Sequence, residues 1–371
     1  MGIIKTLSAH QAAIMDSLCD DDANQIWEAA AGAGKTSTIE HAIRTVLSDL
    51  VCLYLVFNRK NADEAMERLG DTEAMTLTLN SCGFRALQNA RKYRLDKGKI
   101  WDCIKEAMPN RAENAAYGKI VMQLVNLARN EGLGSCVLPD TDDAWQDIIE
   151  KYALDTDSAN TNTYDCIRLS RKVLAGCMSR ARKGSIDFCD MNYLPCVEGF
   201  EARWPACDIV FVDEAQDLNA IQIENVAQIV EQNNARVVFV GDPWQAIYGF
   251  RGAVNEAMES LKKRFSCKMM PLSVCWRCDA SMIRLAQTTG APIQVAPGKP
   301  EGRTESLDSY STVPGDVVLC RTTAPLIGAC YRLISQGQAA VVLGKDIGAG
   351  LTALVKKLRA KSINELSQKL G

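Results

Sequence analysis

The chain has 371 residues, of which 47% are hydrophobic and 23% charged, as is typical of a folded protein of two or three domains. Its formal net charge of −3 gives no overall attraction to nucleic acid, although binding would need only a local basic groove. No apolar run approaches the ~18 residues of a membrane helix, and the N-terminal MGIIKTLSAH has no signal-peptide core. We therefore expect neither a membrane span nor a membrane partner.

The first ninety residues alternate strand and helix patterns. Four segments carry this pattern after the strand-like Ile26–Ala30: a helix up to about Leu50, a strand at Val51–Phe57, a helix over 58–70 and a strand at Met75–Leu79. Such a β-α-β alternation predicts a parallel sheet, and hence an α/β fold.

The next hundred residues, 88–185, have helical spacing and no strong strand pattern. Ile120–Arg129 and Asp165–Arg182 read as amphipathic helices, so this stretch is predicted to be a helical insertion. Apolar runs that suit fully buried strands return at Asp208–Val212 and Arg236–Val240.

A third region begins near residue 272. It contains two further predicted strands, Asp316–Cys320 and Ala339–Leu343, with a helix between them, and a loop rich in Pro, Gly and Ser over 296–315. These elements predict the start of a second α/β domain.

The fifteen cysteines are scattered singly, which favours reduced thiols in an intracellular compartment. Cys275 and Cys278 form a C-x-x-C, which could be a redox pair or half of a zinc site. Because His10 and His41 are the only histidines and no second C-x-x-C exists, a buried or incidental pair is the favoured interpretation. The opening MGIIKT also fits the short N-myristoylation pattern, which often matches by chance.

The sharpest local signal is AAAGAGKT, which ends at Thr36, follows a predicted strand and opens a predicted helix. Glycines let backbone N–H groups converge on phosphate oxygens, and the helix N-terminus adds its positive dipole end. Lys35 can reach the β- and γ-phosphates of a nucleoside triphosphate, and Thr36 can ligate Mg²⁺. The predicted nucleotide-binding residues of this loop are Gly32, Ala33, Gly34, Lys35, Thr36 and Ser37.

The four apolar residues 209–212 are followed by Asp213 and Glu214. This pattern is typical of the acidic strand that completes a phosphate-binding site. Asp213 is predicted to hold Mg²⁺ through water, and Glu214 to position and activate the attacking water. Alone, either motif could be a glycine-rich turn or an acidic helix cap. Together, at the ends of two predicted strands, they predict an NTPase.

A third strand leads into GDPWQAIYGFRGA, in which Gln245 can sense a γ-phosphate by hydrogen bonding. Tyr248, Phe250 and Arg251 stand at near-alternate positions that suit base stacking, worth roughly 1–3 kcal/mol per base. On spacing alone, the two aromatic residues could equally be core residues.

This segment resembles motif III of the UvrD-like superfamily 1 DNA helicases, which typically move 3′ to 5′ on single-stranded DNA. Further segments resemble family motifs in the family's order. Gln11 falls on the Gln that reads adenine, and Phe57, followed by Asn58, falls on the motif Ia Phe that stacks on a base. Asn80 stands where the family often has His in a DNA-contacting motif.

The resemblance continues past residue 272. In LSVCWRC, Trp276 lies where the family has its adenine-stacking Tyr, and Arg277 falls on an arginine finger. The segment 186–195 resembles the one preceding the acidic strand, and 317–348 resembles the first strand, helix and strand of a second RecA-like domain. The motifs are closer to phage and F-box helicases than to housekeeping repair enzymes.

The resemblance implies RecA-like parallel sheets, with 1–87 plus 186–271 as ATPase domain 1A, 88–185 as insertion 1B and 272–371 as a partial domain 2A. It also implies ATP and Mg²⁺ as cofactors and single-stranded DNA as the partner. The location it implies is the cytoplasm or nucleoid, or the host cytoplasm for a phage protein. The family's motifs V and VI, which supply a second arginine finger, do not occur in the sequence. Arginine fingers contribute about 10³–10⁵ in rate. We therefore expect an incomplete motor, a truncated product or half of a split enzyme whose partner would be a separate C-terminal helicase half.

Two other functions remain open from the sequence. One is an ATP-gated module that binds single-stranded DNA or another partner without turnover, which the lack of motifs V and VI allows. The other is an NTPase that acts on something other than nucleic acid. The aromatic and Arg positions at 57 and 248–251 argue against that last function.

Overall fold

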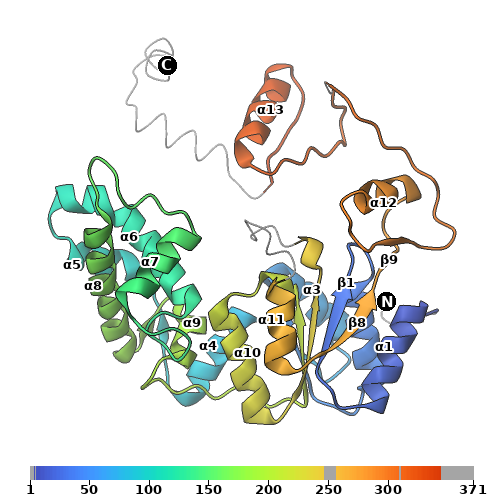
Figure 1. The fold of residues 1–371 in the computed structure, drawn as a ribbon, viewed down its shortest axis with the longest axis horizontal. Helices are drawn as coiled ribbons and strands as arrows, with labels where there is room; N and C mark the ends of the chain where they lie inside the picture. Colours follow the sequence, from blue (N-terminus) through green and yellow to red (C-terminus); the bar gives the residue numbers. More distant parts are fainter. Residues whose placement is uncertain (1–3, 5, 246–255, 309–310, 344–371) are drawn as a thin grey trace. The chain divides into compact units, whose positions relative to one another are not determined.

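The computed structural model describes residues 4, 6–245, 256–308 and 311–343 (Figure 1). The chain forms two compact units, Met1–Thr304 and Glu305–Gly371. The boundary between the units therefore falls after the predicted domain boundary at 272, and the predicted three-part division stays a prediction.

A six-stranded sheet forms the centre of the first unit, and its strands run parallel in the order β3-β2-β6-β7-β1-β8. The strands are β1 (Gln25–Ala29), β2 (Cys52–Val56), β3 (Met75–Thr78), β6 (Ile209–Asp213), β7 (Arg236–Gly241) and β8 (Lys268–Leu272). The strands β2 and β6 are buried throughout, which explains their continuous apolar runs. The predicted α/β fold with a parallel sheet is confirmed, and only β8 lacked a prediction.

Helices cover both faces of the sheet (Figure 1). One face packs against α1 (Ala9–Asp20), α2 (Lys35–Arg44) and α3 (Arg59–Leu69). The other packs against α4 (Leu79–Ala90), α10 (Ala220–Asn233) and α11 (Glu256–Phe265). Because successive strand residues point to opposite faces, Phe211 joins the first core and Val210 the second.

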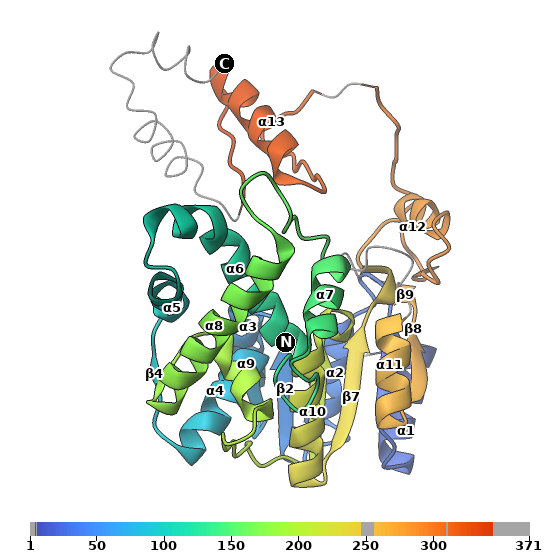
Figure 2. The same cartoon turned by 60° about the vertical axis from the view of Figure 1, so that its left-hand side comes forward.

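Residues 99–182 form four helices, which pack around a hydrophobic cluster that also includes Leu87, Tyr193 and Ile221. They are α5 (Lys99–Ala107), α6 (Arg111–Glu131), α7 (Asp142–Lys151) and α8 (Thr163–Arg182). The short parallel pair β4 (Arg94–Leu95) and β5 (Ser185–Ile186) brings the two ends of this segment together. The following α9 (Asp190–Tyr193) lies against α4 and α10 (Figure 2).

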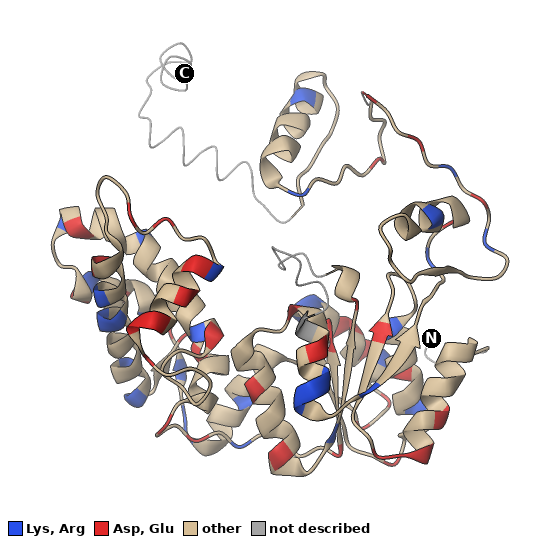
Figure 3. Cartoon of the chain, viewed as in Figure 1, with Lys and Arg blue, Asp and Glu red and all other residues tan. Residues whose placement is uncertain are grey.

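Basic residues run along α8, but most of them are engaged by acidic neighbours (Figure 3). Arg168 pairs with Asp165, and Arg180 pairs with Glu106. Arg171 pairs with both Asp140 and Asp142. This helix therefore offers less free positive charge to a phosphate backbone than its sequence suggests.

No helix in the described part of the chain has both the length and the apolar character that crossing a bilayer requires.

After β8 the first unit continues through β9 (Val274–Cys275), α12 (Ala280–Gln287) and β10 (Gln294–Val295), which pairs with β9. In the second unit, the helix predicted between two strands is present as α13 (Thr323–Ser335).

The two predicted strands at 316–320 and 339–343 are wrong, because neither segment is a strand in the described residues. Their apolar side chains are largely exposed, with Leu319 at 89% and Leu343 at 86%. A strand needs a neighbour to satisfy its N–H and C=O groups. The described residues of this unit provide no such neighbour.

Candidate active site

The carboxyl ends of parallel strands meet at one edge of a sheet, and the predicted site residues follow these ends. The phosphate loop follows β1, Phe57 follows β2 and Asn80 follows β3. Asp213 closes β6, and Gln245 lies in the short helix after β7. The fold therefore gathers at one edge residues that are scattered over more than two hundred positions of the sequence.

The phosphate loop has the backbone that its glycines require. Gly32 and Gly34 have φ of 71° and 84°, the left-handed region that a side chain strains. Gly34 is the N-cap of α2 and supplies no side-chain acceptor to the first-turn N–H groups. Its carbonyl accepts hydrogen bonds from the Thr38 backbone N–H at 2.9 Å and from Thr38 Oγ1 at 2.8 Å. The open N-terminus of α2 is therefore suited to an anion.

Lys35 and Glu214 form an ion pair across the loop, with Nζ and Oε2 2.8 Å apart. The same Oε2 accepts a hydrogen bond from Gln216 Nε2 at 2.8 Å. Glu214 has a φ of 52°, unusual for a residue with a side chain, and such strain concentrates at functional sites. The structure thus brings the predicted phosphate-binding Lys and the predicted catalytic carboxylate into direct contact.

Tyr54 links the two predicted Mg²⁺ ligands, a role that the sequence analysis missed. Its hydroxyl donates a hydrogen bond to Asp213 Oδ2 at 3.0 Å and is within hydrogen-bonding reach of the Thr36 side chain. Burial and the neighbouring Glu214 raise the pKa of Asp213. Burial and Asp213 likewise raise the pKa of Tyr54. The only sequence signal was a polar aromatic residue within an otherwise apolar strand.

Replacing Tyr54 by phenylalanine is expected to lower the free energy of unfolding by about 1–2 kcal/mol at about pH 7, since it strips a donor from the buried Asp213 carboxylate. The folded pKa of Asp213 lies above the unfolded one, so its ionisation destabilises the fold as pH rises between the two values. Losing the donor raises the folded pKa further. Urea unfolding with EDTA should therefore show a smaller loss at about pH 4 than at pH 7, and an equal loss would contradict this account.

Gln216 connects the acidic strand to the segment after β7. Its Oε1 accepts a hydrogen bond from the Asp242 N–H at 3.0 Å, while its Nε2 holds Glu214. Asp242 Oδ2 in turn accepts a hydrogen bond from Gln245 Nε2 at 2.6 Å. A Cβ placed on Gly241 would lie 2.5 Å from Gln216 Oε1, so a side chain at this position would displace the Gln216 amide from its contacts. The sequence could not reveal this chain of contacts, because Gln216 has no role in a motif on its own.

The residues predicted to hold adenine lie near the phosphate loop but have contacts of their own. Gln11 is buried; its Oε1 caps α1 by accepting from the Ser8 N–H, and its Nε2 donates to Thr38 Oγ1 at 3.0 Å. The Trp276 backbone N–H donates to the Gly32 carbonyl at 2.9 Å, and its indole is partly exposed. Arg277 is exposed beside Gly32. Their roles toward a nucleotide stay predictions.

The predicted DNA-binding residues divide into two groups. Phe57 is 56% exposed, and Asn58 caps α3 by accepting from the Asn61 N–H at 2.9 Å. Asn80 donates to the Phe188 carbonyl and accepts from Asn192 Nδ2 at 2.8 Å, so it also ties α4 to the segment around α9. Tyr248, Phe250 and Arg251 lie outside the described residues.

A cavity of about 30 Å³ is lined by residues predicted to bind DNA and by residues predicted to act on ATP. The first are Phe57 and Asn80, and the second are Asp213 and Glu214. This volume holds about one water molecule. Asp217, which also lines it, has a buried Oδ1 without a hydrogen-bond partner. The predicted DNA side and the predicted ATP side are therefore adjacent at the end of β6.

A family model of the UvrD/REP helicase N-terminal domain matches residues 11–266, which contain the phosphate loop, the acidic strand and Gln245. The chain belongs to the UvrD/REP helicase family. The resemblance to UvrD-like superfamily 1 helicases is thereby confirmed. The family match ends before Trp276 and Arg277, so the roles predicted for these two residues depend on the motif resemblance alone.

Individual proteins are also similar to this chain. DNA helicase II of Haemophilus influenzae is 25% identical over 71% of this chain and 38% of its own length. F-box DNA helicase 1 of Gallus gallus is 29% identical over 61% of this chain and 22% of its own length. A solved structure of Pif1 helicases at forked DNA matches 78% of this chain and 49% of that one, with 12% identity and a TM-score of 0.35. The chain thus spans less than two fifths of the length of these two curated relatives.

Proposed function

We propose that this chain binds ATP with Mg²⁺ at the carboxyl edge of its sheet and hydrolyses ATP when single-stranded DNA is bound. It would act as part of an intracellular UvrD-like DNA helicase or translocase that moves 3′ to 5′. The observation that carries the proposal is the 2.8 Å contact between Lys35 Nζ and Glu214 Oε2. A phosphate-binding cation and a catalytic carboxylate are thus within reach of one γ-phosphate, at the open N-terminus of α2.

Each residue has a proposed role in ATP hydrolysis. The backbone N–H groups of the phosphate loop and Lys35 bind the β- and γ-phosphates. Thr36 and Asp213 are suited to Mg²⁺ because they offer a hydroxyl and a carboxylate oxygen, the hard ligands that this ion prefers. When bound, the metal neutralises charge that develops on the phosphate oxygens. Glu214 orients the attacking water and accepts its proton.

Two glutamines are proposed to relay the state of the phosphate site. Gln245 senses the γ-phosphate, and its bond to Asp242 connects it through Gln216 to Glu214. Any shift of Gln245 on nucleotide binding would therefore change the position of the Glu214 carboxylate through these hydrogen bonds. Arg277 is the proposed arginine finger, and Gln11 with Trp276 is proposed to hold adenine.

Single-stranded DNA is proposed to run over the same edge of the sheet. Phe57 offers an exposed ring for stacking, and Asn58 and Asn80 offer polar groups beside it. Tyr248, Phe250 and Arg251, which lie outside the described residues, are proposed DNA contacts on the motif resemblance alone. The proposed domain division, with 1–87 plus 186–271 as the ATPase domain, places β3 and β6 in one rigid body, so DNA contacts and catalytic residues would move together.

Steady-state ATP hydrolysis of the purified chain tests this function, with and without a single strand of about 20 nucleotides. We expect the DNA to stimulate turnover, and Glu214→Gln to abolish it while nucleotide binding persists. Glu198→Gln, on an exposed loop away from the sheet edge, is the matched control and should leave turnover unchanged. ATP binding with turnover at background, with and without DNA, would instead favour an ATP-gated binding module. Absence of ATP binding would refute both functions.

A further inference from the structure

The C-x-x-C segment of Cys275 and Cys278 packs directly against the phosphate loop. A Cβ placed on Gly32 would lie 2.9 Å from Cys275 Sγ and 2.8 Å from the Cβ of Arg277. The two segments therefore pack so closely at this glycine that no side chain fits between them. The Trp276 N–H donates to the Gly32 carbonyl at 2.9 Å. A change in the backbone of 275–278 must therefore be transmitted to the phosphate loop.

The two thiols differ in their surroundings. Cys275 is fully buried against Ile283 and Ile293 at the end of β9, where pairing with β10 fixes its backbone. Cys278 is only half-buried and follows two residues of irregular backbone, Trp276 and Arg277. Its thiol is within hydrogen-bonding reach of Cys275. Approach of the two sulfurs would hence move Cys278 and the residues between, while Cys275 stays in place.

We propose that Cys275 and Cys278 form a reversible disulfide that weakens ATP binding at the adjoining phosphate loop. This inference rests on the proposed function of that loop as the ATP site. Trp276 and Arg277, the proposed adenine and arginine-finger residues, are the two residues enclosed in the ring. Closing the ring fixes their backbone and pulls on the Gly32 contact, so the nucleotide meets an altered surface.

The oxidant is a low-molecular-weight disulfide such as glutathione disulfide, and the chemistry is thiol–disulfide exchange. The Cys278 thiolate attacks one sulfur of the oxidant, which forms a mixed disulfide and releases one small thiolate. Cys275 loses its proton and attacks Cys278 Sγ, which forms the Cys275–Cys278 bond and releases the second small thiolate. The two protein thiols are oxidised, the small disulfide is reduced, and the two protons pass to the released thiolates.

The setting suits a slow, regulated reaction. Burial and the neighbouring Cys275 raise the pKa of the Cys278 thiol, so little thiolate exists at neutral pH and exchange quickens as pH rises. All fifteen cysteines are free in the described structure. Disulfides in reducing compartments are characteristically transient and redox-sensing.

A second close thiol pair provides the matched control. The thiols of Cys136 and Cys196 also lie within hydrogen-bonding reach, and the Cys136 N–H donates to the Cys196 carbonyl at 3.0 Å. This pair lies on the loop after α6 and on the short helix after α9, away from the phosphate loop. Oxidation there should leave ATP binding unchanged.

The test compares wild type, Cys278→Ser and Cys136→Ser, each reduced or treated with glutathione disulfide. Peptide mapping scores the 275–278 link, and a fluorescent ATP analogue measures affinity. We expect the link in wild type and Cys136→Ser, with affinity lowered roughly tenfold and restored by dithiothreitol. Cys278→Ser should bind the analogue like reduced wild type under both conditions.

Two results would overturn the inference alone: no 275–278 link, or a link that leaves affinity unchanged. A loss of affinity in oxidised Cys278→Ser would overturn it as well, because another thiol would then be responsible. Failure of reduced wild type to bind the analogue would instead refute the proposed ATP site, and the regulatory consequence with it.

Discussion

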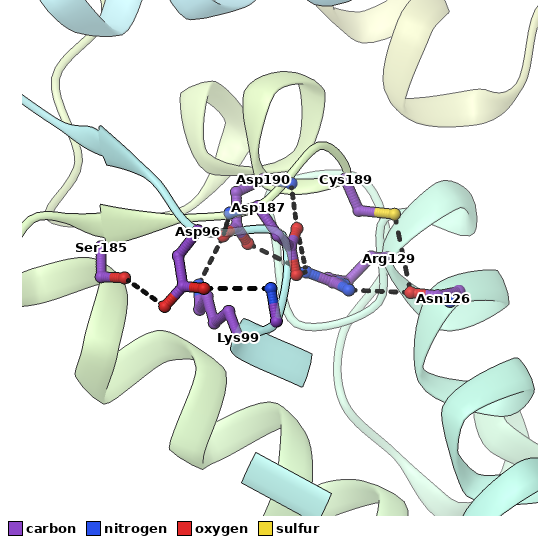
Figure 4. Close-up of polar contacts among 9 residues, drawn as sticks. Asp96, Lys99, Asn126, Arg129, Ser185, Asp187, Cys189 and Asp190 are labelled. Atoms are coloured by element: carbon purple, nitrogen blue, oxygen red, sulfur yellow. Dashed lines mark hydrogen bonds and ion pairs between the residues drawn. The ribbon is translucent and has the colours of Figure 1, made fainter. Parts of the chain in front are cut away.

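Asp190→Asn is expected to lower the free energy of unfolding by about 3–5 kcal/mol, because it leaves two buried cations with a single carboxylate. Asp190 and Lys99 have no exposed surface, and Arg129 is 1% exposed. Asp190 contacts Lys99 through one carboxylate oxygen, and Arg129 through the other at 3.0 Å. Asp187 also accepts from Arg129, at 2.9 and 3.0 Å, so two positive and two negative charges are enclosed together (Figure 4).

This cluster joins elements that are far apart in the chain. Lys99 comes from α5, Arg129 from α6, and the two aspartates flank the start of α9. The Asp187 N–H donates to Asp190 Oδ2 at 2.8 Å, and the Asp190 N–H donates to Asp187 Oδ1 at 3.1 Å. Loss of the Asp190 charge therefore also loosens the turn that leads into α9, and with it the anchoring of the insertion helices.

Urea unfolding followed by circular dichroism measures the loss, with Asp102→Asn as the control. Asp102 forms an exposed pair with Lys105 at 3.4 Å, and its replacement should change stability by less than about 0.5 kcal/mol. The double variant Lys99→Met with Asp190→Leu leaves Arg129 paired with Asp187 and no net buried charge. It should therefore be more stable than Asp190→Asn alone. A double variant that loses more than the single variant would contradict this explanation.

Much of the fold could be predicted from local pattern, because the strands that are buried on both faces carry unbroken apolar runs. β2 and β6 are such strands, and both lie within two residues of their predicted bounds. The phosphate loop was equally readable, since Gly32 and Gly34 occupy the positive φ values that only glycine adopts without strain. Such features depend only on residues that are consecutive in the sequence.

Features that depend on distant partners could not be predicted. The apolar runs at 316–320 and 339–343 read as strands, yet they have no neighbouring strand in the described structure and remain exposed. Gln216 and Tyr54 gained their roles only when β6 came to lie beside β2 and β7. Asn80 resembled a DNA contact, and in the structure it bonds to Phe188 and Asn192. A sequence motif indicates which functional groups are present, whereas the partner that each group contacts depends on how the elements pack.

Lys35→Ala is expected to reduce ATP turnover by about 10²–10³-fold, the effect of removing one preorganised donor from a transferring phosphoryl group. Glu214→Gln should abolish turnover, and the two variants are expected to change ATP affinity in opposite directions. In the structure Lys35 is engaged by Glu214 at 2.8 Å, so ATP must compete with that carboxylate for the ammonium group.

The contrast follows from the strength of the ion pair. Both side chains retain some exposure, 13% for Lys35 and 29% for Glu214, so the pair contributes on the order of 0.2–1 kcal/mol. Glu214→Gln releases Lys35 and should strengthen ATP binding by up to roughly fivefold, whereas Lys35→Ala should weaken it. Lys60→Ala and Glu64→Gln, from an exposed pair on α3, are the controls and should bind ATP like wild type. If Glu214→Gln bound ATP more weakly than wild type, Glu214 would be helping to hold the nucleotide, and the ion pair could not be a competitor for Lys35.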